Sequence, residues 1–75
     1  GMRVERGQKY YCINDNINIS TILETESSKD NLRFASGNYF RTKEQALKAR
    51  AAVMEVLKLI LAAPSQGLTK LNAGD

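Results

Sequence analysis

Hydrophobic and polar residues alternate along two stretches in the first third of the chain. Residues 8–14 are rich in aromatic and β-branched side chains, and from residue 17 to residue 24 the odd-numbered positions carry isoleucine, threonine and leucine while the even-numbered ones are mostly polar. A period of two is typical of a strand with one buried face. Asp15 and Asn16 lie between the stretches, and both residue types favour turns because their side chains bond nearby backbone. The pattern predicts a β-hairpin.

A third, shorter alternation follows the polar loop of residues 25–31. Residues 32–34 read Leu-Arg-Phe, which we interpret as a third strand that completes an antiparallel meander. The Ser-Gly-Asn run at 36–38 predicts a second turn, because Gly37 can adopt a positive φ at low cost. Residues 38–41 are the alternative third strand, or a fourth one.

One long helix is expected after this turn. Thr42 followed by Gln45 fits a capping box, in which the threonine oxygen accepts from the backbone N–H of residue 45. From Lys43 the residues are mostly strong helix formers, and Pro64 stops the run, which gives a helix of roughly 20 residues and about 30 Å. The expected fold class is therefore α+β: a three-stranded antiparallel β-meander followed by one long C-terminal amphipathic helix.

The apolar surface of this helix is broader than one packing face needs. Placed at about 100° intervals, its apolar residues span about 240°, whereas a single face needs roughly 100°. The second half of the helix then has more apolar surface than a small sheet can cover. Either the tail folds back through Leu68 and Leu71, or a second copy covers the surface. We expect a homodimer, because two-fold pairs are the commonest oligomers, with an interface at Val53, Met54, Leu57 and Leu61.

The length of 75 residues indicates one domain. We assign residues 8–63 to it, residues 1–7 to a cloning remnant (Gly1 before Met2) and a flexible N-terminus, and residues 64–75 to a disordered tail. So short a chain buries only about 60% of its unfolded surface, and small domains often need disulfides, metals or self-association. With a single cysteine and no histidine, self-association is the expected support.

Residues able to run enzyme chemistry are missing from the sequence. Acid–base and nucleophilic catalysis need a titratable group with an oriented partner, most often histidine, and Cys12 lies in mid-strand, where a buried thiol is expected. No glycine-rich run has a phosphate-binding spacing. We interpret Glu24, Glu26 and Asp30 as a solvated edge that deters sheet pairing, rather than as a metal site. We therefore expect no catalytic activity, cofactor, metal or small-molecule substrate.

The charge distribution suggests a second hypothesis. The net charge is +3, and residues 32–50 carry five cations against one acid. Basic side chains neutralise phosphates and tyrosine rings stack on bases, so a nucleic acid or an acidic protein is a candidate partner. The candidate contact residues are Lys9, Tyr11, Arg33, Arg41 and Lys43. No run of 18 apolar residues and no leader pattern is present, so we expect no membrane contact and a cytoplasmic location.

Three segments carry a family resemblance over roughly residues 7–58: Tyr10-Tyr11-x-Ile13, Asp30-x-x-Arg33 and Gly37-Asn38-Tyr39-Phe40-Arg41-Thr42-Lys43-Glu44-Gln45-Ala46. The last segment resembles the G-N-x-F-K-T-K-E-E-A pattern of small phage and prophage proteins of unknown role. It is also similar to the strand-to-helix junction of β-β-β-α DNA-binding domains of the AP2 and integrase arm-binding type. That resemblance implies a sheet in the major groove with cations on its strands. The second predicted strand differs from those domains, since its even-numbered positions lack arginines and aromatic residues.

Overall fold

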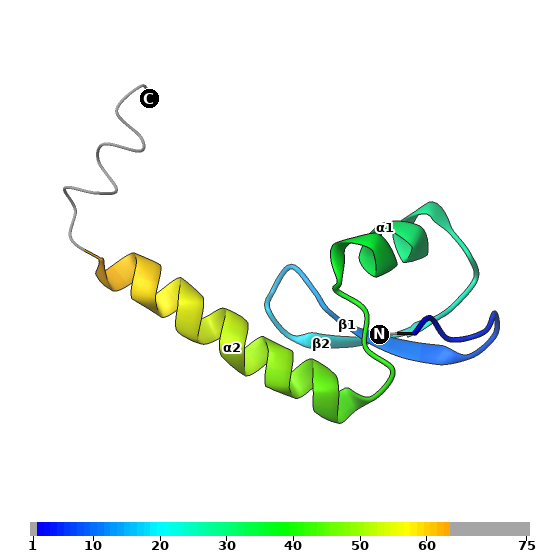
Figure 1. The fold of residues 1–75 in the computed structure, drawn as a ribbon, viewed down its shortest axis with the longest axis horizontal. Helices are drawn as coiled ribbons and strands as arrows, with labels where there is room; N and C mark the ends of the chain where they lie inside the picture. The colour runs from blue at the N-terminus through cyan, green and yellow to red at the C-terminus, as the bar shows by residue number, and fades with distance from the viewer. Residues whose placement is uncertain (1, 64–75) are drawn as a thin grey trace, which may run out of the picture.

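The computed structural model describes residues 2–63 and has an α+β fold. A two-stranded antiparallel hairpin, β1 (Lys9–Ile13) and β2 (Ile19–Leu23), is followed by two helices, α1 (Ser28–Ser36) and α2 (Lys43–Ala62). The helices lie on opposite sides of the hairpin (Figure 1). The residues between α1 and α2 run back past β1, where Phe40 pairs with Tyr11.

The hairpin is confirmed, with its turn at residues 14–18. Tyr11 lies opposite Thr21 in the register. The side-chain oxygen of Asn14 accepts from the backbone N–H groups of Asn16 and Asn18, both at 3.0 Å, and the Asn14 N–H donates to the carbonyl of Asn18 at 2.8 Å. Ile17 within this turn has a φ of 59°, an uncommon value for a β-branched residue.

The predicted third strand at 32–34 is wrong, because these residues belong to α1. Ser27 and Asp30 form a complete capping box at the N-terminus of α1, and Gly37 ends the helix with a φ of 83°. Two helix-end signals nine to ten residues apart outweigh an alternation of only three residues. Leu32 is 68% exposed in the helix. The protein therefore has two helices and not the expected single one.

Residues 38–41 lie along the free edge of β1, as the alternative assignment placed them, but they make only an isolated bridge. Tyr11 and Phe40 exchange two backbone hydrogen bonds, each of 2.8 Å. Beside them, the Asn38 side chain accepts from the Ile13 N–H and donates to the Ile13 carbonyl, both at 2.7 Å. An amide side chain thus replaces one further residue of strand pairing. A hairpin with one bridge takes the place of the three-stranded meander.

Helix α2 begins and ends as expected. The Thr42 side chain accepts from the Gln45 N–H at 3.2 Å. Ala46, in the second turn, is fully buried, and the Arg50 Nε donates to the Ile17 carbonyl at 2.5 Å. The first half of α2 is therefore held against the hairpin. Its second half extends past the hairpin turn (Figure 1).

The core is small and lies on the α1 side of the sheet. It consists of Val4, Tyr10, Cys12 and Tyr39, with Ile22 packed against them. Burial raises the pKa of the Cys12 thiol, as expected for a buried cysteine.

Two expectations about burial need correction. Val4, placed in a flexible N-terminal segment, is only 8% exposed, because it packs into the core. The predicted buried face of β2 is largely open: Thr21 is exposed and Leu23 is 53% exposed, since α2 covers only part of that side. The predicted tail at 64–75 lies outside the described residues.

The capping box gives a direct test of α1. We expect Ser27→Ala to lower the free energy of unfolding by about 1 kcal/mol, because the cap bonds the N-terminus of a helix too short to be stable alone. Ser28→Ala is the matched control, since Ser28 is exposed and begins the helix without a cap role. Urea denaturation measures both. Equal losses for the two variants would contradict the assigned cap.

Candidate functional site

Two stacked tyrosine rings lie at the centre of the molecule. Tyr10 of β1 and Tyr39 lie with ring centroids 3.9 Å apart and planes 16° from parallel. Each hydroxyl bonds a buried carboxylate, and each carboxylate also binds an arginine. We call this group the tyrosine–carboxylate cluster; it consists of Arg3, Tyr10, Glu24, Asp30, Arg33 and Tyr39.

One half of the cluster centres on Asp30, which is 1% exposed. The Tyr10 hydroxyl donates to Asp30 Oδ1, and Arg33 Nη1 donates to the Tyr10 hydroxyl at 2.8 Å. Asp30 Oδ2 accepts from the backbone N–H groups of Thr25 at 3.0 Å and Ser27 at 3.1 Å. The bond from Tyr10, together with these backbone bonds, holds the pKa of Asp30 well below its usual range. Burial, reinforced by the bond to Asp30, raises the pKa of Tyr10 to about 12.

The other half centres on Glu24, which is also 1% exposed. Arg3 donates to it through Nε at 2.6 Å and Nη2 at 3.1 Å, and the Tyr39 hydroxyl donates at 2.6 Å. The Glu26 N–H adds a bond of 2.9 Å. The Arg3 hydrogen bonds are the main reason that the pKa of Glu24 is lowered, and burial is the main reason that the pKa of Tyr39 is raised.

This geometry makes the cluster a structural junction. Burial raises the pKa of both phenols, so both stay protonated near neutral pH and act as hydrogen-bond donors. Every buried side-chain nitrogen and oxygen in residues 2–63 has a hydrogen-bond partner. Within the same residues no group of three potential ligands could hold a metal ion. The cluster joins the N-terminal segment, the hairpin, α1 and the residues before α2.

The expected solvated acidic edge is therefore wrong for two of its three residues. Glu24 and Asp30 are buried in the cluster, and only Glu26 is exposed. The sequence contains one signal for Asp30, the Ser-x-x-Asp spacing of the capping box. Glu24 has none, because its partners Arg3 and Tyr39 are 21 and 15 residues away along the chain.

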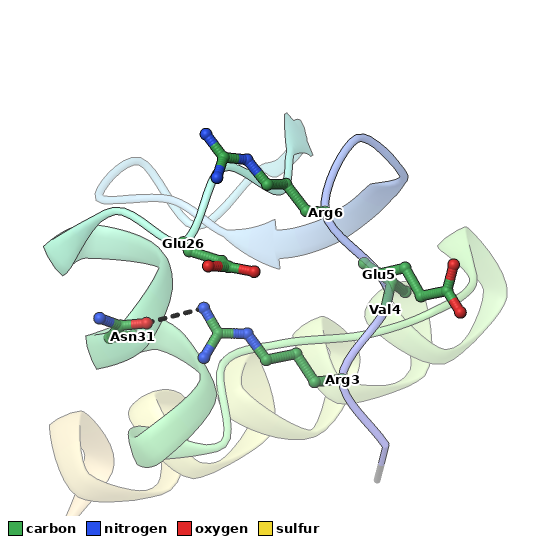
Figure 2. Close-up of a pocket in the computed structure, with 6 residues that line it drawn as sticks. All are labelled: Arg3, Val4, Glu5, Arg6, Glu26 and Asn31. Carbon is green, nitrogen blue, oxygen red and sulfur yellow. Dashed lines mark hydrogen bonds between the residues drawn. The ribbon is translucent and has the colours of Figure 1, made fainter.

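A shallow hollow of about 470 Å³ lies beside the cluster, between the N-terminal segment and α1. In Figure 2, Arg3 reaches across it to Asn31, while Glu5 points away. The Arg3 to Asn31 hydrogen bond is 2.7 Å. The charged residues that line the hollow are two arginines and two glutamates. Because the positive and negative side chains are equal in number, the hollow has no excess charge to attract an ion, and we interpret it as a solvated surface.

The structure separates the residues predicted to contact nucleic acid. Arg33 bonds Tyr10 and Asp30 on the α1 side of the sheet. Because Phe40 lies opposite Tyr11 in an antiparallel bridge, the chain beyond Phe40 runs toward the end of the hairpin where Lys9 lies. Lys9, Arg41 and Lys43 are all exposed, and Tyr11 is partly exposed. Three of the four cations thus lie at one end of the hairpin, without Arg33.

The residues predicted for a dimer interface lie on the second half of α2. Val53, Leu57 and Leu61 are 37%, 49% and 85% exposed, and Met54 is partly covered. Val56 and Ile60, on the same half of the helix, are 54% and 52% exposed. The uncovered surface is therefore larger than the four predicted residues. No helix within residues 2–63 has both the length and the apolar character to cross a bilayer.

The cluster predicts how stability depends on pH. Asp30 and Glu24 have lowered pKa values, so their stabilising effect is present above their ordinary pKa values of about 3.9 and 4.3 and is lost as pH falls through the folded values. Tyr10, with its pKa raised to about 12, stabilises fully below about pH 10 and progressively less from there to about 12. Urea denaturation across pH should thus show a plateau with an acid and an alkaline decline.

Two variants test this assignment. Tyr10→Phe should reduce the alkaline decline, because the titrating hydroxyl is gone. Glu55→Gln is the control for the acid decline, since Glu55 forms only an exposed pair with Lys58 and should leave that decline unchanged. An acid decline that Glu55→Gln removes would show that surface acids, and not the buried pair, cause it.

The comparisons with known proteins give no match. No protein-family model, no curated protein and no solved structure matches this chain. The resemblance of residues 37–46 to small phage proteins therefore stays a prediction.

Proposed function

We propose that the protein is a small, non-catalytic interaction or accessory protein that acts by binding and self-associates through α2. One observation carries the proposal: the second half of α2 extends past the hairpin with its apolar side chains uncovered. On the resemblance of residues 37–46, we place it among phage or mobile-element proteins that act in the cytoplasm.

The uncovered surface is large enough to drive association. The aliphatic side chains that face outward together on the second half of α2 are 37–85% exposed; they are Val53, Val56, Leu57, Ile60 and Leu61. Burying a half-exposed side chain of this size contributes about 1 kcal/mol, so two copies gain roughly 10 kcal/mol. Association itself costs about 4 kcal/mol or more. The balance is at most about 6 kcal/mol, which supports a dissociation constant between about 40 μM and 1 mM.

Sedimentation equilibrium over that concentration range tests self-association. We expect the wild-type mass to rise with concentration, and Val56→Lys to weaken association at least about tenfold, because a lysine cannot be buried unpaired. Leu32→Lys is the control, since Leu32 is an exposed aliphatic residue on α1, 68% exposed against 54% for Val56. A wild-type chain that is monomeric throughout, or equal weakening by both variants, would contradict the proposal.

A second candidate function is contact with nucleic acid. It is supported by Lys9, Arg41 and Lys43, which are exposed at one end of the hairpin and form no ion pair with any residue in 2–63. Tyr11, partly exposed on β1, could add base stacking.

Fluorescence anisotropy on duplex and single-stranded DNA tests this candidate. We expect binding at about 50 mM salt that weakens steeply by about 200 mM, because counterion release drives phosphate contacts. Lys43→Gln should reduce the affinity, whereas Lys29→Gln on α1 should not. Absence of binding at about 50 mM salt rules the candidate out.

A further inference from the structure

A regular apolar stripe runs along α2 from its buried half to its uncovered half. It consists of Ala49, Val53, Val56 and Ile60, at spacings of four, three and four residues. Alternating steps of three and four keep side chains on one helix face, the arrangement by which helices pair in coiled coils. Ala49 is partly buried, and the other three are 37–54% exposed.

The stripe is complementary to itself when reversed. If a second α2 runs antiparallel, with the two-fold axis between Met54 and Glu55, Ala49 of each copy lies opposite Ile60 of the other and Val53 opposite Val56. The smallest side chain of the stripe then faces the largest, and the two valines face each other. Such alternation lets two helices approach closely and fill the space between them.

A groove at the buried end of the stripe matches this pairing. It has a volume of about 580 Å³, and its walls include Ala49 and Val53 from α2 and Ile13, Ile17 and Phe40 from the body of the protein. Because Ala49 is small, the groove is open where Ile60 of a reversed second copy would lie. In the antiparallel arrangement, the protruding end of one helix would lie in the groove of the other.

The charged side chains of this stretch leave the stripe free. Arg50 bonds the Ile17 carbonyl, Lys48 pairs with Glu44 at 4.0 Å, and Glu55 pairs with Lys58 at 3.8 Å. All of these lie off the stripe on the helical wheel. No charge would have to be buried between two copies.

We propose that a second copy of this chain occupies the groove, through an antiparallel two-fold α2 pair in the register Ala49–Ile60 and Val53–Val56. This deepens the proposed self-association and rests on it. A parallel pair would place groove against groove and leave both empty, while the protruding ends met only each other. The antiparallel pair fills both grooves and covers both ends at once.

Disulfide crosslinking separates the two arrangements. Val53→Cys and Val56→Cys are made separately in the full chain, and each is oxidised alone and in an equal mixture under mild conditions. In the antiparallel register the new thiol at position 53 faces the new thiol at position 56 of the other copy, so the mixture should give several-fold more crosslinked dimer than either variant alone. Wild-type Cys12, 3% exposed, provides the background. Lys29→Cys, exposed on α1, controls for random collision.

The outcomes distinguish the register from self-association itself. More crosslinking in the mixture than in either variant alone supports the register. Crosslinking of each single variant to itself at a yield equal to or above that of the mixture overturns the register, and a yield above the mixture indicates a parallel pair. If the position 53 and 56 variants crosslink no more than Lys29→Cys while the wild-type chain sediments as a dimer, the interface lies elsewhere on the protein. A monomeric wild-type chain overturns the proposed function as well.

Discussion

Two tyrosine hydroxyls bonded to buried carboxylates hold this fold together. The Tyr10 hydroxyl donates to Asp30 and so connects the hairpin to α1. The Tyr39 hydroxyl donates to Glu24 and so connects the segment before α2 to the end of β2. The apolar core is too small to do this alone, and Leu32 of α1 faces solvent. A hydrogen bond to a charged group contributes about 1.5–3 kcal/mol, but the desolvation of each carboxylate offsets much of that. The pairing also favours this arrangement, because a packing that buried Glu24 or Asp30 away from its partners would leave a charge unpaired.

The hairpin and α2 could be predicted because each follows from local pattern. Residues 8–24 alternate around a turn, and Thr42 and Pro64 bound a run of helix formers. Helix α1 has signals of the same kind in Ser27, Asp30 and Gly37. The brief alternation at 32–34 instead predicts a strand, and Gly37 on its own predicts a turn. For short segments, cap residues are the better guide, because an alternation of three positions fits either structure.

The tyrosine–carboxylate cluster could not be predicted, because its partners meet only in the folded chain. Arg3 and Glu24 are charged residues in a polar context, which is usually exposed. The surplus apolar surface of α2 was predictable in kind, since the width of the arc follows from the sequence alone. The position of this surface along α2 could not be predicted, because it depends on how far the hairpin covers the helix. The same limit applies to Arg33, whose role in binding Asp30 depends on α1.

The left-handed backbone of Ile17 has a further meaning. Most side chains cost roughly 1–2 kcal/mol in this conformation, because the Cβ lies too close to the following carbonyl oxygen. Glycine avoids this cost because it has no Cβ, and asparagine offsets it by hydrogen-bonding nearby backbone. Isoleucine instead forms a wall of the groove beside α2. Natural sequences are minimally frustrated, and exceptions concentrate where a surface is used. Ile17 is such a point of local frustration: the turn adopts a strained backbone conformation, and the isoleucine side chain adds apolar surface beside the helix.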